Sequence, residues 1–114
     1  MIDLDYAYGK CHALSAAILA IAPAAEAFGL FVDGTCIHSA VRVPHTTAFV
    51  DAFGLEEGEG ALATKAARYL RADETFTWKP ISETDLFAMV PGVGSADRAR
   101  NIRAARKHAV ALLN

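Results

Sequence analysis

A cysteine stands at the predicted start of an apolar helix, a position where its chemistry differs from that of an ordinary core residue. The stretch YGKCHALSAAILAIA, residues 8–22, places Gly9 and Lys10 directly before Cys11. The unpaired amides and the positive end of the helix dipole favour the thiolate form of a thiol at that position. The same amides would stabilise the oxyanion formed when a thiolate attacks a carbonyl carbon. Cys11 is therefore a candidate nucleophile; the other interpretations are a buried structural thiol and part of a secretion signal.

A nucleophilic thiolate usually needs a histidine as base, and the histidine needs an acceptor that orients it. The chain has four histidines: His12, His38, His45 and His108. His12 is adjacent to Cys11 on the helix, where neighbouring side chains diverge, so it is a poor partner. His45 is expected in a turn and His108 on a basic helix.

His38 and Asp51 both fall in the middle of predicted strands, where an unpaired imidazole or carboxylate is costly to bury. If those two strands are antiparallel neighbours, a His38–Asp51 pair removes both costs. Cys11, His38 and Asp51 are therefore the candidate set of residues for nucleophilic catalysis. We expect no cofactor and no metal, because Cys36 and His38 on one strand face have only His45 as a close further zinc ligand. Cys36 itself is expected to pack in the core.

The predicted secondary structure places these residues on a helix and a sheet. A helix from about Cys11 to Ala22 ends near Pro23. The segment 28–34 reads as a buried strand closed by an Asp-Gly turn, and 36–43 alternates with period two. A further strand is predicted at 48–54, and the connection between these two strands is short enough for an antiparallel pair.

The second half of the chain predicts mostly helices. Residues 55–60 read as a loop, and 61–70 as a helix whose apolar stripe is Leu62, Ala66, Tyr69 and Leu70. An edge strand is predicted at 75–81. Ser82 and Ser95 are expected to cap two further helices. The fold class is α+β: an N-terminal helix that carries the cysteine packs on an antiparallel sheet, with additional C-terminal helices.

Length and composition limit the classes of protein that fit. The chain has 114 residues, 54% of them hydrophobic, and a formal net charge of −2, which predicts one domain over 1–114. Two cysteines do not make a disulfide framework. The apolar stretch 13–22 is too short to span a bilayer, and the acidic start with Asp3 and Asp5 is unlike a secretion signal. We expect a cytoplasmic protein that keeps its N-terminus and does not enter a membrane.

Charge is unevenly distributed along the chain. Six basic and twelve acidic side chains precede residue 94, whereas five basic and one acidic follow. The segment MVPGVGSADRARNI, residues 89–102, is similar to the helix-hairpin-helix DNA-binding motif. However, Arg98 stands where that motif usually has a small residue. A solvated helix face is the favoured interpretation, and DNA contact is the minor one.

The ordered segments GKC, HSAVRV and AFVDAFG resemble the papain-like/transglutaminase-like superfamily of cysteine enzymes, especially its small bacterial domains. The resemblance covers roughly residues 8–54 and implies a helix bearing Cys11 against a sheet bearing His38 and Asp51. The resemblance also implies that Cys11 is the nucleophile, His38 the general base and acid, and Asp51 the group that orients His38. The chain departs from papain in having no glutamine ahead of Cys11, and His12 stands where an aromatic residue usually follows the cysteine.

These features predict a cysteine hydrolase, deamidase or acyl transferase that acts on an amide or thioester bond of a protein or small acyl substrate. The alternative is a non-catalytic interaction module of the same fold. In that case the basic C-terminal helix would contact DNA or an acidic protein.

Overall fold

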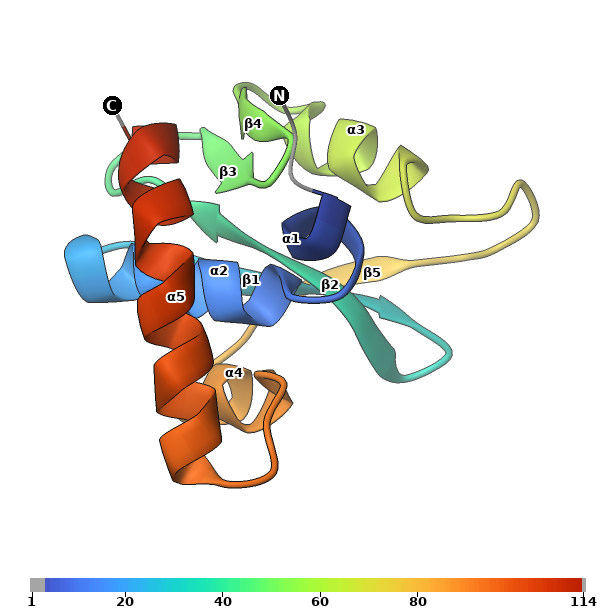
Figure 1. Cartoon of the computed structure of the whole chain (residues 1–114). Helices are drawn as coiled ribbons and strands as arrows, with labels where there is room; N and C mark the ends of the chain where they lie inside the picture. Colours follow the sequence, from blue (N-terminus) through green and yellow to red (C-terminus); the bar gives the residue numbers. More distant parts are fainter. Residues whose placement is uncertain (1–3, 114) are drawn as a thin grey trace.

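Five antiparallel strands form the sheet on which the candidate site is built. The computed structural model of the chain describes residues 4–113. The strands are β1 (Glu26–Val32), β2 (Thr35–Arg42), β3 (Phe49–Asp51), β4 (Gly54–Glu56) and β5 (Thr77–Pro80), in the spatial order β4-β3-β2-β1-β5 (Figure 1). The predicted strands 28–34, 36–43 and 75–81 are confirmed, as is the antiparallel pairing of β2 with β3.

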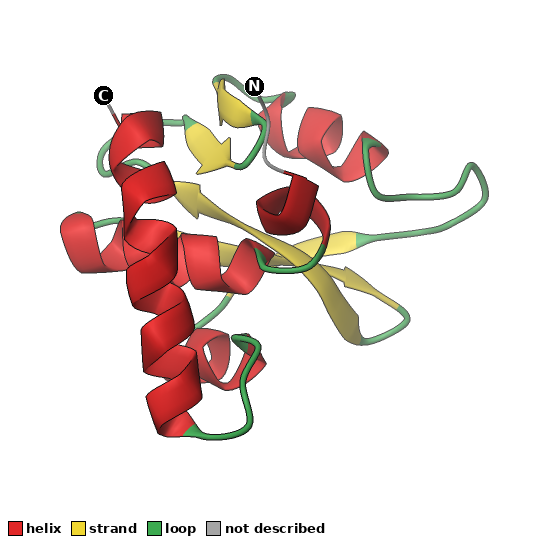
Figure 2. Cartoon of the chain, in the orientation of Figure 1, coloured by secondary structure: helices red, strands yellow, loops and turns green. Residues whose placement is uncertain are grey.

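The helices are α1 (Leu4–Tyr8), α2 (Cys11–Ile21), α3 (Ala61–Ala67), α4 (Glu83–Met89) and α5 (Ser95–Leu113). Of these, α2 and α5 lie in front of the sheet in the view of Figure 2. The helix α2 packs on β2 with one side and on α4 and α5 with the other, so it is the central layer of the molecule. The short helix α1 was not expected from the sequence. No helix within residues 4–113 is long and apolar enough to cross a membrane.

The segment after β2 differs from the sequence-based expectation. Residues 48–54 were expected to form one strand, with a loop after them, but the chain turns at Ala52 and Phe53 and returns as β4. Two features explain the turn. Gly54 takes a φ of +101°, which favours glycine. The Phe53 amide donates a 2.9 Å hydrogen bond to Oδ1 of Asp51, which closes an Asx-type turn.

The alternation of side chains along β2 decides what each face of the sheet contacts. Val41 pairs with Val50 across β2 and β3, and both belong to the core that Leu14 and Ile18 of α2 complete. Residues two apart on a strand share a face. Ser39 therefore points with Val41 toward α2, and the side chain of His38 points to the opposite face of the sheet.

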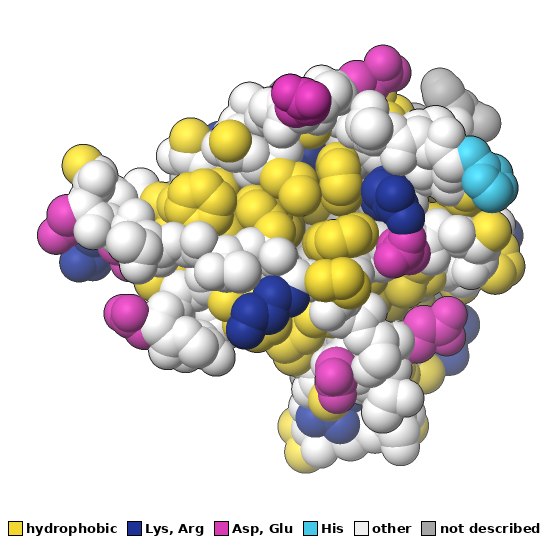
Figure 3. All heavy atoms as spheres, turned by 180° about the vertical axis from the view of Figure 1, so that it is seen from behind, with side chains coloured by type: hydrophobic (Ala, Val, Ile, Leu, Met, Phe, Trp, Pro, Cys, Tyr) yellow, Lys and Arg dark blue, Asp and Glu magenta, His cyan; other side chains and the backbone are white. Residues whose placement is uncertain are grey.

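Hydrophobic side chains gather over the sheet on the side away from α2 and α5, which Figure 3 shows from behind. Phe28 and Phe49 meet edge to face there, with ring centroids 5.4 Å apart. Nearby, Arg42 and Glu26 form an ion pair. Both faces of the sheet thus carry apolar side chains, and the segment from α3 to β5 lies along one end of the second face.

The packing of α2 on the sheet gives a stability prediction. Leu14 is 2% exposed, whereas Leu4 is 63% exposed. Truncation of Leu14 to alanine removes buried surface and leaves a cavity, so L14A should lower the free energy of unfolding by about 2–5 kcal/mol. L4A should change it by less than about 0.5 kcal/mol. Urea unfolding followed by circular dichroism measures both, and equal effects would contradict the central position of α2.

Candidate active site

His38 and Asp51 form a buried pair across β2 and β3. Nε2 of His38 lies 2.9 Å from Oδ2 of Asp51, and the two residues are 0% and 2% exposed. The ladder between the strands contains only the pairs Val41–Val50 and Arg42–Phe49. Beyond it the two strands separate, and the imidazole bridges the gap to the carboxylate diagonally. The expected contact between His38 and Asp51 is therefore present.

A lysine that the sequence analysis overlooked completes the surroundings of Asp51. Nζ of Lys65, from α3, lies 2.8 Å from Oδ1 of Asp51, and its exposure is 0%. It also donates to the Gly54 carbonyl at 2.9 Å and to Oε1 of Glu56 at 3.0 Å. Burial alone would raise the pKa of Asp51, but the hydrogen bond from His38 and the charge of Lys65 outweigh it and lower the pKa. Asp51 is therefore ionised at neutral pH.

The burial of Lys65 could have been predicted in part from the sequence. It lies four residues after Ala61 and four before Tyr69, and residues at that spacing share a helix face. The expected stripe was apolar and began at Leu62. The observed buried face of α3 consists instead of Ala61, Lys65 and Ala66. A lysine between small residues on one face was the available signal.

The ionised carboxylate fixes the tautomer of His38. An ionised carboxylate only accepts hydrogen bonds, so Nε2 of His38 must carry the proton that it donates to Asp51. Burial lowers the pKa of His38, against the opposing hydrogen bond and charge of Asp51. The neutral imidazole then has an unprotonated Nδ1 with a free lone pair. This nitrogen is buried and has no hydrogen-bond partner.

Cys11 is the first residue of α2, as expected, but its thiol is not activated in this conformation. It is 7% exposed, and burial raises the pKa of the thiol to about 11. The backbone amides of Ser39, His12 and Cys11 itself act in the opposite direction, but they do not compensate for the lost water. The expectation that the helix terminus and a charged His38 would favour the thiolate is therefore wrong for this closed state.

The sulfur of Cys11 and the imidazole of His38 belong to one cluster without being hydrogen-bonded to each other. The sulfur approaches the amide of Ser39, the residue that follows His38, at the part of β2 where β3 no longer pairs. The ring of Tyr69 stacks on His38 with centroids 3.9 Å apart, and burial together with the charges of Asp51 and Cys11 raises the pKa of the Tyr69 phenol. The hydrogen bond expected between Cys11 and His38 is absent in this structure, because Nε2 of His38 bonds to Asp51 and Nδ1 has no partner. It stays a prediction.

Three aromatic rings cover this cluster, and we call Tyr8, Phe53 and Tyr69 the aromatic cap. Their ring centroids lie 5.4–6.2 Å apart. The Tyr69 hydroxyl donates to the Ala7 carbonyl at 2.9 Å, which ties the cap to α1. Arg68 lies 4.8 Å over the ring of Phe53. Tyr69 stacks on His38, so this ring of the cap shields the imidazole from water.

A second histidine contacts the same strand. Nδ1 of His12 lies 2.9 Å from Oγ of Ser39, which is also 2.8 Å from Oγ of Ser15. Burial and the neighbouring His38 lower the pKa of His12 to about 4. His12, which the sequence analysis gave as a poor partner for Cys11, is partly buried. The structure shows that it joins α2 to β2 through a hydroxyl network.

The remaining candidates lie apart from this cluster. Cys36 is partly buried, and its thiol donates to the His38 carbonyl at 3.3 Å. His45 is exposed, in a turn with a φ of +62°. His108, on α5, contacts the ring of Tyr6 of α1. Among the residues that the structure describes, no three His, Cys, Asp or Glu side chains are grouped so that they could hold a metal ion.

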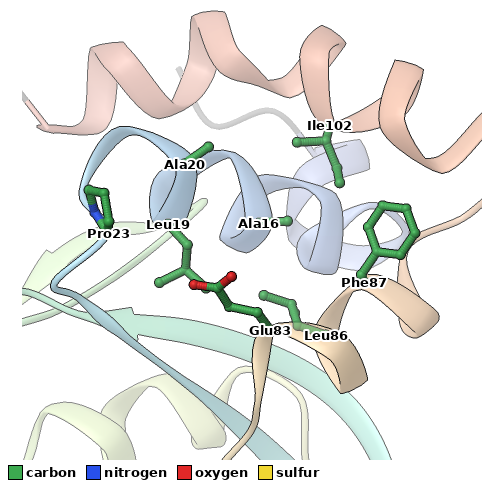
Figure 4. A pocket seen from close by; sticks show the side chains of 8 residues that line it. All are labelled: Ala16, Leu19, Ala20, Pro23, Glu83, Leu86, Phe87 and Ile102. Carbon is green, nitrogen blue, oxygen red and sulfur yellow. The ribbon is translucent and has the colours of Figure 1, made fainter. Parts of the chain in front are cut away.

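A cavity of about 350 Å³ lies at the other end of α2, between α2, α4 and α5 (Figure 4). Its lining is almost entirely apolar: Ala16, Leu19, Ala20, Pro23, Glu83, Leu86, Phe87 and Ile102. Cys11 begins the helix and is absent from this lining. The cavity is therefore separate from the candidate active site.

No family model, curated protein or solved structure matches the chain. The residues themselves are thus the basis for any functional conclusion.

The lowered pKa of His12 predicts a loss of stability in acid. The unfolded chain takes up the His12 proton below its ordinary pKa of 6.5, whereas the folded protein resists it until about pH 4, so stability falls as pH decreases between these values. H12Q keeps a hydrogen-bonding side chain but does not titrate. Its free energy of unfolding should decrease less over this range than that of the wild type, by about 1–3 kcal/mol.

The matched control is H45N, which replaces an exposed histidine at a positive φ with a residue that tolerates it. Urea unfolding at pH 4, 5, 6 and 7 gives the comparison. H45N should follow the wild type, and an H12Q curve parallel to the wild type would contradict the assignment.

Removal of the stacked ring should activate the thiol. Y69A admits water to the cluster, which lowers the pKa of Cys11, and each unit of pKa increases the thiolate fraction about tenfold below that pKa. Iodoacetamide should therefore modify Cys11 about tenfold faster in Y69A than in the wild type at pH 8. Y69F keeps the ring and should react like the wild type. Peptide mass spectrometry measures the rates, and Cys36 serves as the internal reference.

Proposed function

We propose that the protein is a cysteine-dependent hydrolase, deamidase or acyl transferase that uses a Cys11–His38–Asp51 triad on an amide or thioester substrate. The observation that carries the proposal is the buried Nδ1 of His38, an acceptor lone pair without a partner. Asp51 orients the ring, and the sulfur of the helix-start cysteine approaches the amide of Ser39, the residue that follows His38. A general base needs this combination of a neutral, oriented imidazole and a nearby acidic proton.

The chemistry follows from these groups. The Cys11 thiol gives its proton to Nδ1 of His38 while the sulfur attacks the acyl carbon. The leaving amine or thiol takes that proton as its bond to the acyl carbon breaks, which leaves a thioester on Cys11. Water or an acceptor amine, deprotonated by the same nitrogen, then attacks the thioester and restores the thiol. Asp51 stabilises the imidazolium that exists between these steps.

The amides at the start of α2 supply the second requirement, stabilisation of the oxyanion. The backbone amides of Cys11, His12 and Ser39 already converge on the sulfur. An acyl oxygen beside the sulfur would meet donors of the same set. The aromatic cap must move for a substrate to enter, because the cluster is closed to water.

The arrangement of the elements also fits the papain-like/transglutaminase-like resemblance. In such enzymes a helix bearing the cysteine packs on an antiparallel sheet that bears the histidine and the aspartate. Here α2 begins with Cys11, β2 carries His38 and β3 ends with Asp51. The resemblance supports the proposal through the order and the placement of these three residues.

The test uses an activated acyl ester, 4-nitrophenyl acetate, with the full chain. The wild type should release nitrophenolate and carry an acetyl group on Cys11, which peptide mass spectrometry locates. C11A should fall to the background rate, and H38Q should lose at least about 100-fold. D51N should lose less, because the base remains but its tautomer is no longer fixed.

Two matched variants serve as controls for this experiment. C36S removes the other thiol, and H45N removes an exposed histidine, so each should stay within twofold of the wild type. Acetylation of Cys36 instead of Cys11, or an unchanged rate in C11A, would overturn the proposal. Circular dichroism of each variant establishes that the fold is kept.

A non-catalytic interaction module is the second candidate, and the surface of α5 favours it. Arg103, Arg106 and Lys107 are exposed on this helix. By contrast, Nε of Arg98 donates to the Val90 carbonyl at 3.2 Å and Arg100 pairs with Asp97. Fluorescence anisotropy with a labelled DNA duplex tests this function. The R103Q/R106Q variant should bind DNA more weakly than the wild type, and the acylation of Cys11 should be unchanged in the variant.

A further inference from the structure

A network of four charged side chains beside His38 balances its own charges without the histidine. Asp51 and Glu56 supply two carboxylates, and Lys65 and Arg68 supply two cations. Lys65 contacts both carboxylates, and Arg68 contacts Glu56 with both of its terminal nitrogens. A protonated His38 would add an unbalanced positive charge at a position with no exposure to water, which is costly.

We propose that Lys65 is a positioning residue that acts as the counter-ion of Asp51 and thereby leaves His38 free to be an uncharged base. A lone carboxylate beside a buried imidazole favours the imidazolium, because the histidine is then its only available cation. Here Lys65 is the cation that balances the charge of the Asp51 carboxylate. It occupies Oδ1, so that Oδ2 remains for the Nε2 proton of His38.

The other groups around His38 support the same charge state. They are Asp51 from β3, Lys65 from α3, Arg68 and Tyr69 after α3, Trp78 from β5, His12 from α2, and Cys36, whose thiol contacts the His38 carbonyl. Among these, Asp51 alone favours a positive imidazole. Its effect is opposed by Lys65 and Arg68, and burial acts in the same direction as these two cations.

The inference deepens the proposed function, on which its catalytic meaning rests, but its test requires no substrate. Ring ¹⁵N chemical shifts of the wild type at pH 7 should show His38 as the neutral Nε2–H tautomer, with an unprotonated Nδ1. A doubly protonated His38 at pH 7 would overturn the inference without any variant. A protein that fails to react with acyl esters, yet shows this tautomer, would contradict the proposed function alone.

The variant K65M keeps an unbranched side chain of similar length and removes the charge. Asp51 keeps its hydrogen bonds from the Phe53 amide and His38. The proton affinity of His38, measured by NMR titration of its ring, should rise at least tenfold. In the proposed enzyme, the acidic limb of the pH–rate profile should move to higher pH by at least about one unit, which corresponds to the tenfold rise in proton affinity. A lysine with a merely structural role would not cause this shift.

The matched control is R68M, which removes the cation that contacts Glu56 but not Asp51. Its effect on the proton affinity of His38 should be less than threefold. The double variant K65M/D51N removes the carboxylate as well, and the proton affinity of His38 should then fall below that of K65M. An unchanged or lower affinity in folded K65M would overturn the role of Lys65.

Discussion

The buried carboxylate of Asp51 is the constraint on which the candidate site depends. A carboxylate that is 2% exposed must be hydrogen-bonded on both oxygens and balanced by a cation. Oδ1 accepts from Lys65 and from the Phe53 amide, and Oδ2 accepts from His38. These bonds tie together the turn between β3 and β4, the helix α3 and the strand β2. A change at this one group therefore affects backbone geometry and side-chain chemistry together.

The closed cluster combines two effects of burial that oppose each other. Exclusion of water keeps His38 neutral and its Nδ1 available, which suits a base. The same exclusion raises the pKa of the Cys11 thiol to about 11. A resting thiol and a neutral imidazole are thus the stable pair here, in place of a thiolate and an imidazolium. In the proposed reaction the thiol would therefore give up its proton as its sulfur attacks. A protonated thiol is also less susceptible to oxidation than a thiolate.

The central helix α2 connects this cluster to the rest of the core through small residues. Ala13 and Ala17 on α2, and Ala105 and Ala109 on α5, are nearly or fully buried, so the two helices pack closely over the sheet. The hydroxyl network of His12, Ser15 and Ser39 adds polar contacts from α2 to β2. The position of Cys11 is accordingly set by a helix that has packing contacts on both of its sides.

The sequence by itself determined the elements that bear the candidate residues. The period-two pattern of HSAVRV predicted β2, and the apolar run after Cys11 predicted α2. The cost of burying an unpaired imidazole or carboxylate predicted the His38–Asp51 contact. Each of these inferences rests on local pattern or on a pairwise energy, which a chain of residues displays directly.

Only the tertiary structure decided the electrostatics of the site. The partner of Asp51 on its second oxygen is Lys65, from a helix expected to bury an apolar stripe. Tyr69, whose ring stacks on His38, and α1 lie far apart in the chain and are joined by one hydrogen bond. Charge state and solvation depend on what surrounds a group in three dimensions, so the pKa of the thiol and the tautomer of His38 followed from the packing.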